Sequence, residues 1–312
     1  MAKIGIFDSG YGGLTILESI RKELPSYDYV YLGDNARAPY GTHSFDVIYR
    51  YTLQAVQYLL NKNCALVILA CNTASAKALR TIQQKDLPKI NKPIREGSMR
   101  DGVHKPVNVL GVIRPTVEAV PGITKTGHVG VLATPATVSS ESYVLELDKQ
   151  PYLSSPQGEE SGTGFSVTQQ ACPLWVPLIE NGEHRGDGAD YFVDKYLRAI
   201  LTKDPLIDTL VLGCTHYPLL KDKIESWIHF HREIEESEFP MPEESPCVTV
   251  ISQGDLVARS LKDYLARHPE YREQLSEGGS CQYLTTENAE RFSQSASLFL
   301  SSAIHAEHVD IE

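Results

Sequence analysis

Short apolar runs and amphipathic stretches alternate along the first third of the chain. The runs carry many β-branched residues without regular polar alternation, which is typical of strands covered on both faces. They lie at 3–7, 28–34 and 64–70. The amphipathic stretches predict helices and lie at 14–24, at 45–60 and from Cys71 to about Gln84. This order predicts a parallel sheet with helices on both sides.

The same pattern restarts in the second half of the chain. HVGVLATPATVSS (128–140) predicts a strand, a hydroxyl-bearing loop and a helix, as KIGIFDSGYGGLT does near the start. The strands at 64–70 and 208–213 each run into a cysteine, Cys71 in the first half and Cys214 in the second. The repeated order points to one shared arrangement. We therefore expect an α/β protein of two similar domains, each a mostly parallel sheet flanked by helices.

Polar segments with prolines separate these patterns. Residues 85–106 carry three prolines and are expected to form a linker or insertion, followed by a crossing strand at 107–113. The segments 149–165 and 226–246 are polar or charged. A strand at 247–255 comes next with a helix behind it, and the C-terminal tail adds another strand and helix.

Composition narrows the class of protein. The 312 residues include 40 acidic and 29 basic ones, a formal net charge of −11. This balance argues against a nucleic-acid partner, because such a surface needs clustered basic residues, but it allows a small anionic substrate. The start of the chain has too few apolar residues for a signal peptide, and no stretch is long and apolar enough for a membrane span. We expect a cytoplasmic protein without membrane contact.

The cysteines and histidines give no sign of a metal site. The six cysteines contain no CxxC pair, which argues against a zinc or thioredoxin-type site, and in the cytoplasm they are expected to be reduced. His229 and His231 form an HxH in a charged stretch, but on a helix this spacing points the two rings apart. We interpret that stretch as a solvated surface.

The polar residues at the strand ends are the candidate site. In open parallel sheets, ligands bind beyond the carboxyl ends of the strands. Seven residues fall there by the pattern above: Asp8, Ser9, Pro39, Tyr40, Cys71, Thr134 and Cys214.

Both strand-end cysteines are expected to begin a helix. A helix N-terminus offers free N–H groups and partial positive charge, which stabilise a thiolate. The same amides can bind a carboxylate, together with the side chains of Asn72, Thr73 and Thr215. Two such cysteines suggest racemisation by two bases: one thiolate removes a proton from carbon, and the other thiol returns a proton to the opposite face. Asp8 and His216 are then the proton-handling neighbours.

Other interpretations of these residues stay open. Either cysteine alone is compatible with simple packing in the core. DSGYGGL resembles a nucleotide loop but matches neither GxGxxG nor GxxxxGK[ST]. A Cys–His hydrolase would pair Cys214 with His216 and leave Cys71 without a role. His216 is also compatible with a plain hydrogen-bonding role, and Asp8 with capping the helix that follows it. The other four cysteines lack this strand-end context and are taken as structural.

Six stretches together resemble the glutamate racemases of the aspartate/glutamate racemase superfamily, which are cofactor-independent enzymes. They are IGIFDSGYGGLT, YLGDNARAPYG, ACNTASA, GVLATPATV, QACPLWVPLIE and LGCTHYPLL. The resemblance implies two α/β domains with the active site in the cleft between them. It implies domains at 1–105 plus 225–312 and at 106–224. It also implies no cofactor or metal, a homodimer, and production of D-glutamate for peptidoglycan.

The resemblance assigns roles to individual residues. It implies that Cys71 acts on D-glutamate with help from Asp8, and that Cys214 acts on L-glutamate with help from His216. Contacts with the substrate are implied for Asp8, Ser9, Pro39, Tyr40, Gly41, Asn72, Thr73, Thr134, Thr137, Glu180 and Thr215. The alternatives are a racemase for aspartate or another acid, and a binding protein on the same scaffold without turnover.

The sequence departs from the family pattern in a few places. Asn35 stands where threonine is usual, and Arg114 stands where an acidic residue is common. The connections at 91–106, 150–163 and 229–246 are longer than usual. None of these departures touches the cysteine motifs.

Overall fold

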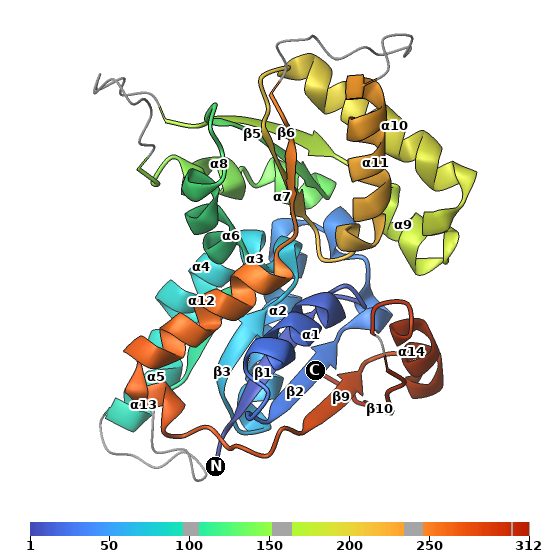
Figure 1. Ribbon diagram of the computed structural model, residues 1–312. Helices are drawn as coiled ribbons and strands as arrows, with labels where there is room; N and C mark the ends of the chain where they lie inside the picture. Colours follow the sequence, from blue (N-terminus) through green and yellow to red (C-terminus); the bar gives the residue numbers. More distant parts are fainter. Residues whose placement is uncertain (96–105, 152–163, 234–245, 301, 312) are drawn as a thin grey trace. The chain divides into compact units, whose positions relative to one another are not determined.

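Two parallel sheets organise the chain (Figure 1). The computed structural model describes residues 1–95, 106–151, 164–233, 246–300 and 302–311. The chain divides into two units, which are Met1–Val112 with Gly254–Glu312, and Ile113–Gln253. Each unit holds one sheet, and every strand pair in both sheets is parallel. The predicted α/β class with two helix-flanked parallel sheets is confirmed.

The sheet of the first unit has the strand order β10-β9-β2-β1-β3-β4. Its central strands are buried along almost their whole length, as their unbroken apolar sequences predict. The strands are β1 (Lys3–Asp8), β2 (Tyr29–Gly33), β3 (Cys64–Leu69), β4 (Asn108–Gly111), β9 (Cys281–Thr285) and β10 (Ala306–His308).

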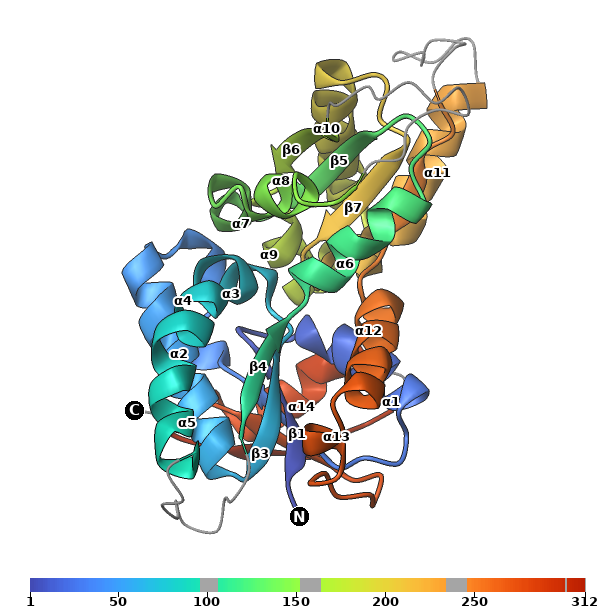
Figure 2. The same cartoon turned by 90° about the vertical axis from the view of Figure 1, so that its left-hand side faces the viewer.

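Helices cover both faces of this sheet. Figure 2 shows strands β1, β3 and β4 between α1 and α12 on one side and α2, α4 and α5 on the other. The helices of the unit are α1 (Gly13–Glu23), α2 (Phe45–Asn61), α3 (Asn72–Lys77), α4 (Leu79–Thr81), α5 (Leu87–Arg95), α12 (Gly254–Arg267), α13 (Pro269–Arg272) and α14 (Ala289–Ala296).

The sheet of the second unit has the order β6-β5-β7-β8. Helices α6 and α8 lie on one side of it, and α10 and α11 on the other (Figure 1). Its strands are β5 (His128–Ala133), β6 (Ser166–Ala171), β7 (Thr209–Gly213) and β8 (Thr249–Ile251). Its helices are α6 (Ile113–Ala119), α7 (Pro135–Ser139), α8 (Ser142–Leu147), α9 (Trp175–Glu180), α10 (Asp187–Lys203) and α11 (Lys221–Glu233).

The two units repeat one strand order. Counted along the chain within each unit, the first four strands stand in the order second, first, third, fourth: β2-β1-β3-β4 and β6-β5-β7-β8. The first strand therefore has the second on one side and the third on the other. Such a topological switch point is where open α/β sheets bind ligands. The shared arrangement inferred from the sequence is thus present in both units.

Part of the segment expected to be a linker is helical. A π-helical turn at Ile82–Asp86 leads into α5. Asn91 anchors α5, because its side-chain amide donates to the Val107 carbonyl and its Oδ1 accepts from the Val107 N–H, both at 3.0 Å. Leu87 and Asn91 are both buried and share one helix face. The sequence pattern does not reveal this short buried face, because prolines and charged residues surround it.

The boundaries of the units differ from the expected ones at 105/106 and 224/225. Strand β4 pairs with β3 and so keeps the chain in the first unit through Val112. Strand β8 pairs with β7, so the second unit continues through Gln253. The longer connections predicted at 91–106, 150–163 and 229–246 lie mostly outside the described residues.

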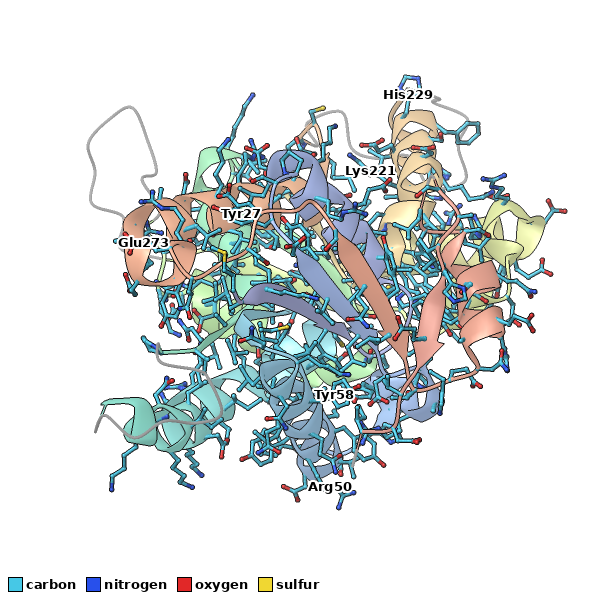
Figure 3. The ribbon with its side chains drawn as sticks, turned by 90° about the horizontal axis from the view of Figure 1, so that it is seen from below. Tyr27, Arg50, Tyr58, Lys221, His229 and Glu273 are labelled. Atoms are coloured by element: carbon cyan, nitrogen blue, oxygen red, sulfur yellow. The ribbon has the colours of Figure 1, made fainter. Side chains whose placement is uncertain are left out.

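Of the two histidines in the HxH motif on α11, one is exposed to solvent and one is buried. His229 points away from the ribbon (Figure 3), but His231 is buried against Trp227, with ring centroids 4.1 Å apart. The expectation of a solvated stretch is therefore wrong for His231, because it lies on the face of α11 that packs on the unit. Among the described residues, no helix is long and apolar enough to cross a membrane.

Asp208 anchors the start of β7, the strand that ends at Cys214. Its buried carboxylate accepts hydrogen bonds from the Thr124 and Thr209 hydroxyls at 2.6 and 2.9 Å, and from two backbone N–H groups, those of Lys125 and Thr126, at 2.5 and 2.8 Å. Burial raises the pKa of Asp208, but these hydrogen bonds outweigh it and hold the pKa below its usual value.

We predict that Asp208→Asn lowers the free energy of unfolding at pH 7 by about 2–4 kcal/mol, because an amide NH₂ then faces backbone donors. The folded-state pKa of Asp208 lies below the unfolded one. The wild-type advantage is therefore complete above about pH 4 and fades as the pH falls further. Denaturant unfolding at several pH values measures it. Asp310→Asn, whose side chain is 92% exposed, is the control. Equal stability of both variants and wild type would contradict the anchoring role.

Candidate active site

The switch point of the first unit brings Asp8 and Cys71 to one sheet edge. Strand β1 ends at Asp8, and β3 runs beside it in register, with Phe7 opposite Leu69. Cys71 follows β3 by two residues. Because parallel strands end at the same edge, the two side chains belong to the same end of the sheet. Asp8 is 1% exposed and Cys71 is 5% exposed.

The Cys71 sulfur has two hydrogen-bonding partners, Ala74 and Ser9. It is the N-cap of α3, and its Sγ accepts a hydrogen bond from the Ala74 N–H at 3.4 Å. The Ser9 hydroxyl lies 3.1 Å from the same sulfur. Asn72 and Thr73 form the first turn of α3 and are buried. The predicted grouping of Ser9, Cys71, Asn72 and Thr73 at a helix start is therefore present.

The Asp8 carboxylate is held at the start of α1. Its Oδ2 accepts a hydrogen bond from the Gly10 N–H at 2.9 Å. A Cβ at Gly13, the first residue of α1, would lie only 2.4 Å from the Asp8 Cβ, so only glycine permits this approach. Gly12 is the N-cap of α1, so the alternative in which Asp8 caps that helix is wrong. A carboxylate at this helix start also disfavours a nucleotide phosphate there, because the two anions would repel.

The loop after β2 contributes the third group of predicted residues. Pro39 is exposed, Gly41 is half-buried and Tyr40 is buried. The Tyr40 hydroxyl donates to Oδ2 of the buried Asp34. Burial, and then the Asp34 charge, raise the pKa of Tyr40 well above its usual value. The phenol therefore stays protonated and is engaged by Asp34.

The switch point of the second unit places Thr134 and Cys214 at one edge. Thr134 follows β5, and Cys214 follows β7, with Ala133 opposite Gly213. Thr134 is the N-cap of α7. Its hydroxyl accepts from the Thr137 N–H at 3.3 Å and donates to the Thr137 hydroxyl at 3.1 Å. Threonine followed by proline is a strong helix-start signal, which explains why the sequence fixes this hydroxyl here.

Cys214 belongs to a row of three side chains with His216 and Glu180. The Cys214 Sγ lies 3.8 Å from the His216 Nδ1, and the His216 Nε2 lies 2.9 Å from the Glu180 Oε1. Burial lowers the pKa of His216, but the hydrogen bonds to Cys214 and Glu180 outweigh burial and raise the pKa to about 10. The imidazole is therefore charged at neutral pH, and a cation faces the sulfur.

The two cysteines are held differently. Cys214 does not begin a helix as expected, because the 3₁₀ helix behind it starts at Tyr217 with His216 as its N-cap. Thr215 lies between Cys214 and His216 and is buried. The sequence HYP places a proline in the first turn, and this keeps the imidazole beside the sulfur. The group next to the sulfur is thus a histidine side chain at Cys214 and a helix N-terminus at Cys71.

The remaining cysteines differ from these two. Burial raises the pKa of Cys64 to about 12 and that of Cys281 to about 11, and it raises the pKa of Cys172 well above the usual value. These three thiols are therefore kept neutral, in accordance with a structural role. Cys247 is exposed, so the expectation of a packing role is wrong for it.

Asp34 is not among the residues predicted from the sequence. It lies one residue after β2, at the same sheet edge as Asp8, and it is fully buried. That position was a usable signal, because a buried carboxylate at a strand end needs partners. Among the described residues, no group of three or more His, Cys, Asp and Glu side chains could hold a metal ion.

Known proteins similar to this chain are racemases. Residues 14–231 match the model of the family described as Asp/Glu/Hydantoin racemase. A protein named glutamate racemase from Ruegeria sp. (strain TM1040) is 38% identical over 307 residues, 95% of this chain and 96% of the relative. One of the same name from Persephonella marina (strain DSM 14350 / EX-H1) is 42% identical over 235 residues, 75% of this chain and 77% of the relative.

Solved structures agree with the sequence match. Glutamate racemase isoform RacE1 from Bacillus anthracis superposes with a TM-score of 0.76 at 29% identity, over 99% of this chain and 98% of that chain. Glutamate racemase from Francisella tularensis subsp. tularensis SCHU S4, solved in complex with D-glutamate, superposes with a TM-score of 0.75 at 28% identity, over 100% and 98% of the two chains. With its two strand-end cysteines in place, the chain belongs to the Asp/Glu/hydantoin racemase family.

Proposed function

We propose that this protein is a glutamate racemase that interconverts L- and D-glutamate with two thiols. The observation that carries the proposal is the repeated switch point: the same strand order presents Cys71 in one unit and Cys214 in the other. Family membership and the relatives named glutamate racemase support the choice of glutamate. So does the D-glutamate bound to the Francisella tularensis protein.

The mechanism requires one thiolate and one thiol on opposite faces of the substrate α-carbon. The Cys214 thiolate takes the α-proton of L-glutamate, and the electron pair stays on carbon next to the carboxylate. The Cys71 thiol then gives its proton to the other face, which yields D-glutamate. Cys214 is left as a thiol and Cys71 as a thiolate, ready for the reverse reaction. Positioned acid–base groups of this kind typically contribute about 10²–10⁴-fold to a rate.

The surroundings of each sulfur suit this exchange. The charged His216, fixed by Glu180, stabilises negative charge on Cys214. At Cys71, the Ala74 N–H and the Ser9 hydroxyl stabilise the negative charge in the same way. Asp8 and His216 are the proposed proton-handling neighbours.

We propose that the substrate carboxylates are bound by polar groups at the two sheet edges. The substrate-contact residues are those expected from the sequence: Asp8, Ser9, Pro39, Tyr40, Gly41, Asn72, Thr73, Thr134, Thr137, Glu180 and Thr215. The physiological role that follows is supply of D-glutamate for peptidoglycan by a cytoplasmic enzyme without a cofactor. A homodimer also stays a prediction.

A cysteine hydrolase is the alternative that one observation favours. Cys214, His216 and Glu180 stand in the order of nucleophile, base and orienting carboxylate. The 3.8 Å between sulfur and imidazole is compatible with such a pair, because hydrogen bonds to sulfur are long. A hydrolase, however, gives Cys71 no role, although its polar setting is as elaborate as that of Cys214. The racemase accounts for both.

Turnover of glutamate tests the proposal directly. Optical rotation or circular dichroism of L-glutamate incubated with the enzyme should fall to zero, because the two enantiomers have equal free energy in water. D-glutamate should reach the same endpoint. L-aspartate is the comparison substrate. Faster racemisation of aspartate than of glutamate would overturn the choice of substrate.

We predict that Cys71→Ala and Cys214→Ala each lower kcat/KM by at least about 10²-fold. The loss must be equal in the two directions, because the equilibrium constant is one. Steady-state kinetics from both enantiomers measures it. Cys247→Ala, which removes an exposed thiol, is the matched control and should match wild type. More than a tenth of wild-type activity in either site variant would contradict the two-thiol assignment.

We predict that Glu180→Gln moves the alkaline limb of the kcat/KM profile to lower pH. The Glu180 carboxylate helps to raise the pKa of His216 to about 10, and burial opposes it. Without the carboxylate the pKa falls, so His216 loses its charge earlier as the pH rises. A profile from about pH 6.5 to 10 measures the shift. Glu183→Gln, an exposed neighbour on the same segment, is the control. An unchanged alkaline limb in Glu180→Gln would rule out this role of Glu180.

A further inference from the structure

Asp34 is a buried carboxylate at the site edge of the first unit, and three side chains donate hydrogen bonds to it. It is fully buried. Its Oδ2 accepts hydrogen bonds from the Tyr40 hydroxyl and from the Arg37 Nε, the latter at 2.7 Å. Its Oδ1 accepts from the Thr286 hydroxyl at 2.9 Å. Three side-chain donors hold this buried carboxylate in place, because the loss of a donor weakens the stabilisation of a buried charge.

Thr286 connects this carboxylate to the C-terminal segment. Its hydroxyl donates to Asp34 and accepts from the Ala36 N–H at 3.0 Å, and its own N–H donates to the Gly33 carbonyl at 3.1 Å. Thr286, which lies 252 positions from Asp34 along the chain, thus holds the turn after β2 in place.

The sheet register explains why these two residues meet. Strands β2 and β9 are parallel neighbours, with Gly33 opposite Thr285. The next residue of each strand, Asp34 and Thr286, therefore leaves the sheet at the same point. Strands β9 and β10 extend the first unit's sheet beyond β2, whereas the second unit's sheet, in the residues that the structure describes, ends at β6. Strand β9 thus gives the loop after β2 a support that has no counterpart in the described part of the second sheet.

Residues Asp34–His43 form what we call the substrate loop, since it carries Pro39, Tyr40 and Gly41. Arg37 is held within it by a second set of contacts: its Nη1 donates to the Gln54 Oε1 at 2.7 Å, and its guanidinium lies 4.1 Å from the Tyr51 ring centre. The loop is therefore tied to α2 on one side and to the end of β9 on the other. Within these contacts, Asp34 is the shared acceptor for Arg37, Tyr40 and Thr286.

We propose that Asp34 and Thr286 are positioning residues for catalysis: Thr286 fixes Asp34, and Asp34 fixes the Tyr40 turn against which the substrate binds. The proposal rests on the proposed function, because it takes the Tyr40 turn as a substrate contact. Neither residue touches the reacting carbon. Their effect is to keep the loop in its binding geometry before the substrate arrives, which lowers the cost of binding.

The variant Thr286→Val tests this proposal. It keeps the shape of the side chain but removes the donor to Asp34 and the acceptor for the Ala36 N–H. We expect KM for both enantiomers to rise about tenfold, with kcat changed about threefold or less. Thr286→Ser keeps the hydroxyl and should stay within about twofold of wild type. Thr249→Val, at an exposed strand position of the second unit, controls for the substitution itself.

A second variant approaches Asp34 from the other side. Tyr40→Phe removes only the hydroxyl that Asp34 binds and should also raise KM. If both variants act through Asp34, the double variant raises KM by less than the product of the two single effects. Tyr40→Phe alone still tests the Asp34 contact where Thr286→Val does not fold, and an unchanged KM in Tyr40→Phe would then overturn the proposal. Fully multiplicative effects would overturn the proposal, and so would a Thr286→Ser variant as impaired as Thr286→Val.

Amide hydrogen exchange separates this proposal from the proposed function. Without any substrate, residues 35–43 should exchange faster in Thr286→Val than in wild type and at wild-type rates in Thr286→Ser. If wild type fails to racemise glutamate but this exchange difference holds, the substrate assignment is wrong and the positioning of the loop stands. If glutamate is racemised but exchange and KM are unchanged in Thr286→Val, the positioning role is wrong.

Discussion

The proposed racemisation places one constraint on the rest of the structure: a buried sulfur that removes a proton from carbon needs stabilisation of its negative charge. Cys71 and Cys214 are 5% and 7% exposed, so water contributes little to that stabilisation. Protein groups must supply it from fixed positions. The end of a buried parallel strand offers such positions, because the backbone behind it is rigid and the segment ahead of it can present donors.

The two units meet this constraint with the same topology and different chemistry. In both, the first and third strands lie side by side and the cysteine follows the third. At Cys71 the partners are the Ala74 N–H, which donates to the sulfur, and the Ser9 hydroxyl beside it. At Cys214 the partner is a charged imidazole, oriented by Glu180. A racemase acts on two mirror-image substrates, but its own chain has no mirror symmetry. Different hydrogen-bonding partners at the two sulfurs are therefore consistent with the proposed chemistry.

Local patterns predicted most of this and missed what depends on distant contacts. Unbroken apolar runs predict buried strands, and two of these runs, at 64–70 and 208–213, lead directly to Cys71 and Cys214. Helix α5 was missed because its buried face is short and includes the polar Asn91, whose amide is satisfied by Val107. The Glu180–His216 pair joins two residues that are 36 positions apart along the chain. The Thr286–Asp34 contact joins two that are 252 positions apart. No periodicity in either segment signals such a pairing, which follows only from the sheet order and register.

The central claim is that two thiols share one proton transfer, and isotope incorporation tests it most directly. The enzyme is given L-glutamate in D₂O and stopped after a few per cent of conversion, and the separated enantiomers are weighed by mass spectrometry. Two thiols predict that the D-glutamate formed carries deuterium at the α-carbon, because Cys71 has already exchanged with solvent. The recovered L-glutamate stays largely protiated where Cys214 returns the proton it has just taken. Protium retained at the α-carbon of early D-glutamate would show one base serving both faces and would contradict the account.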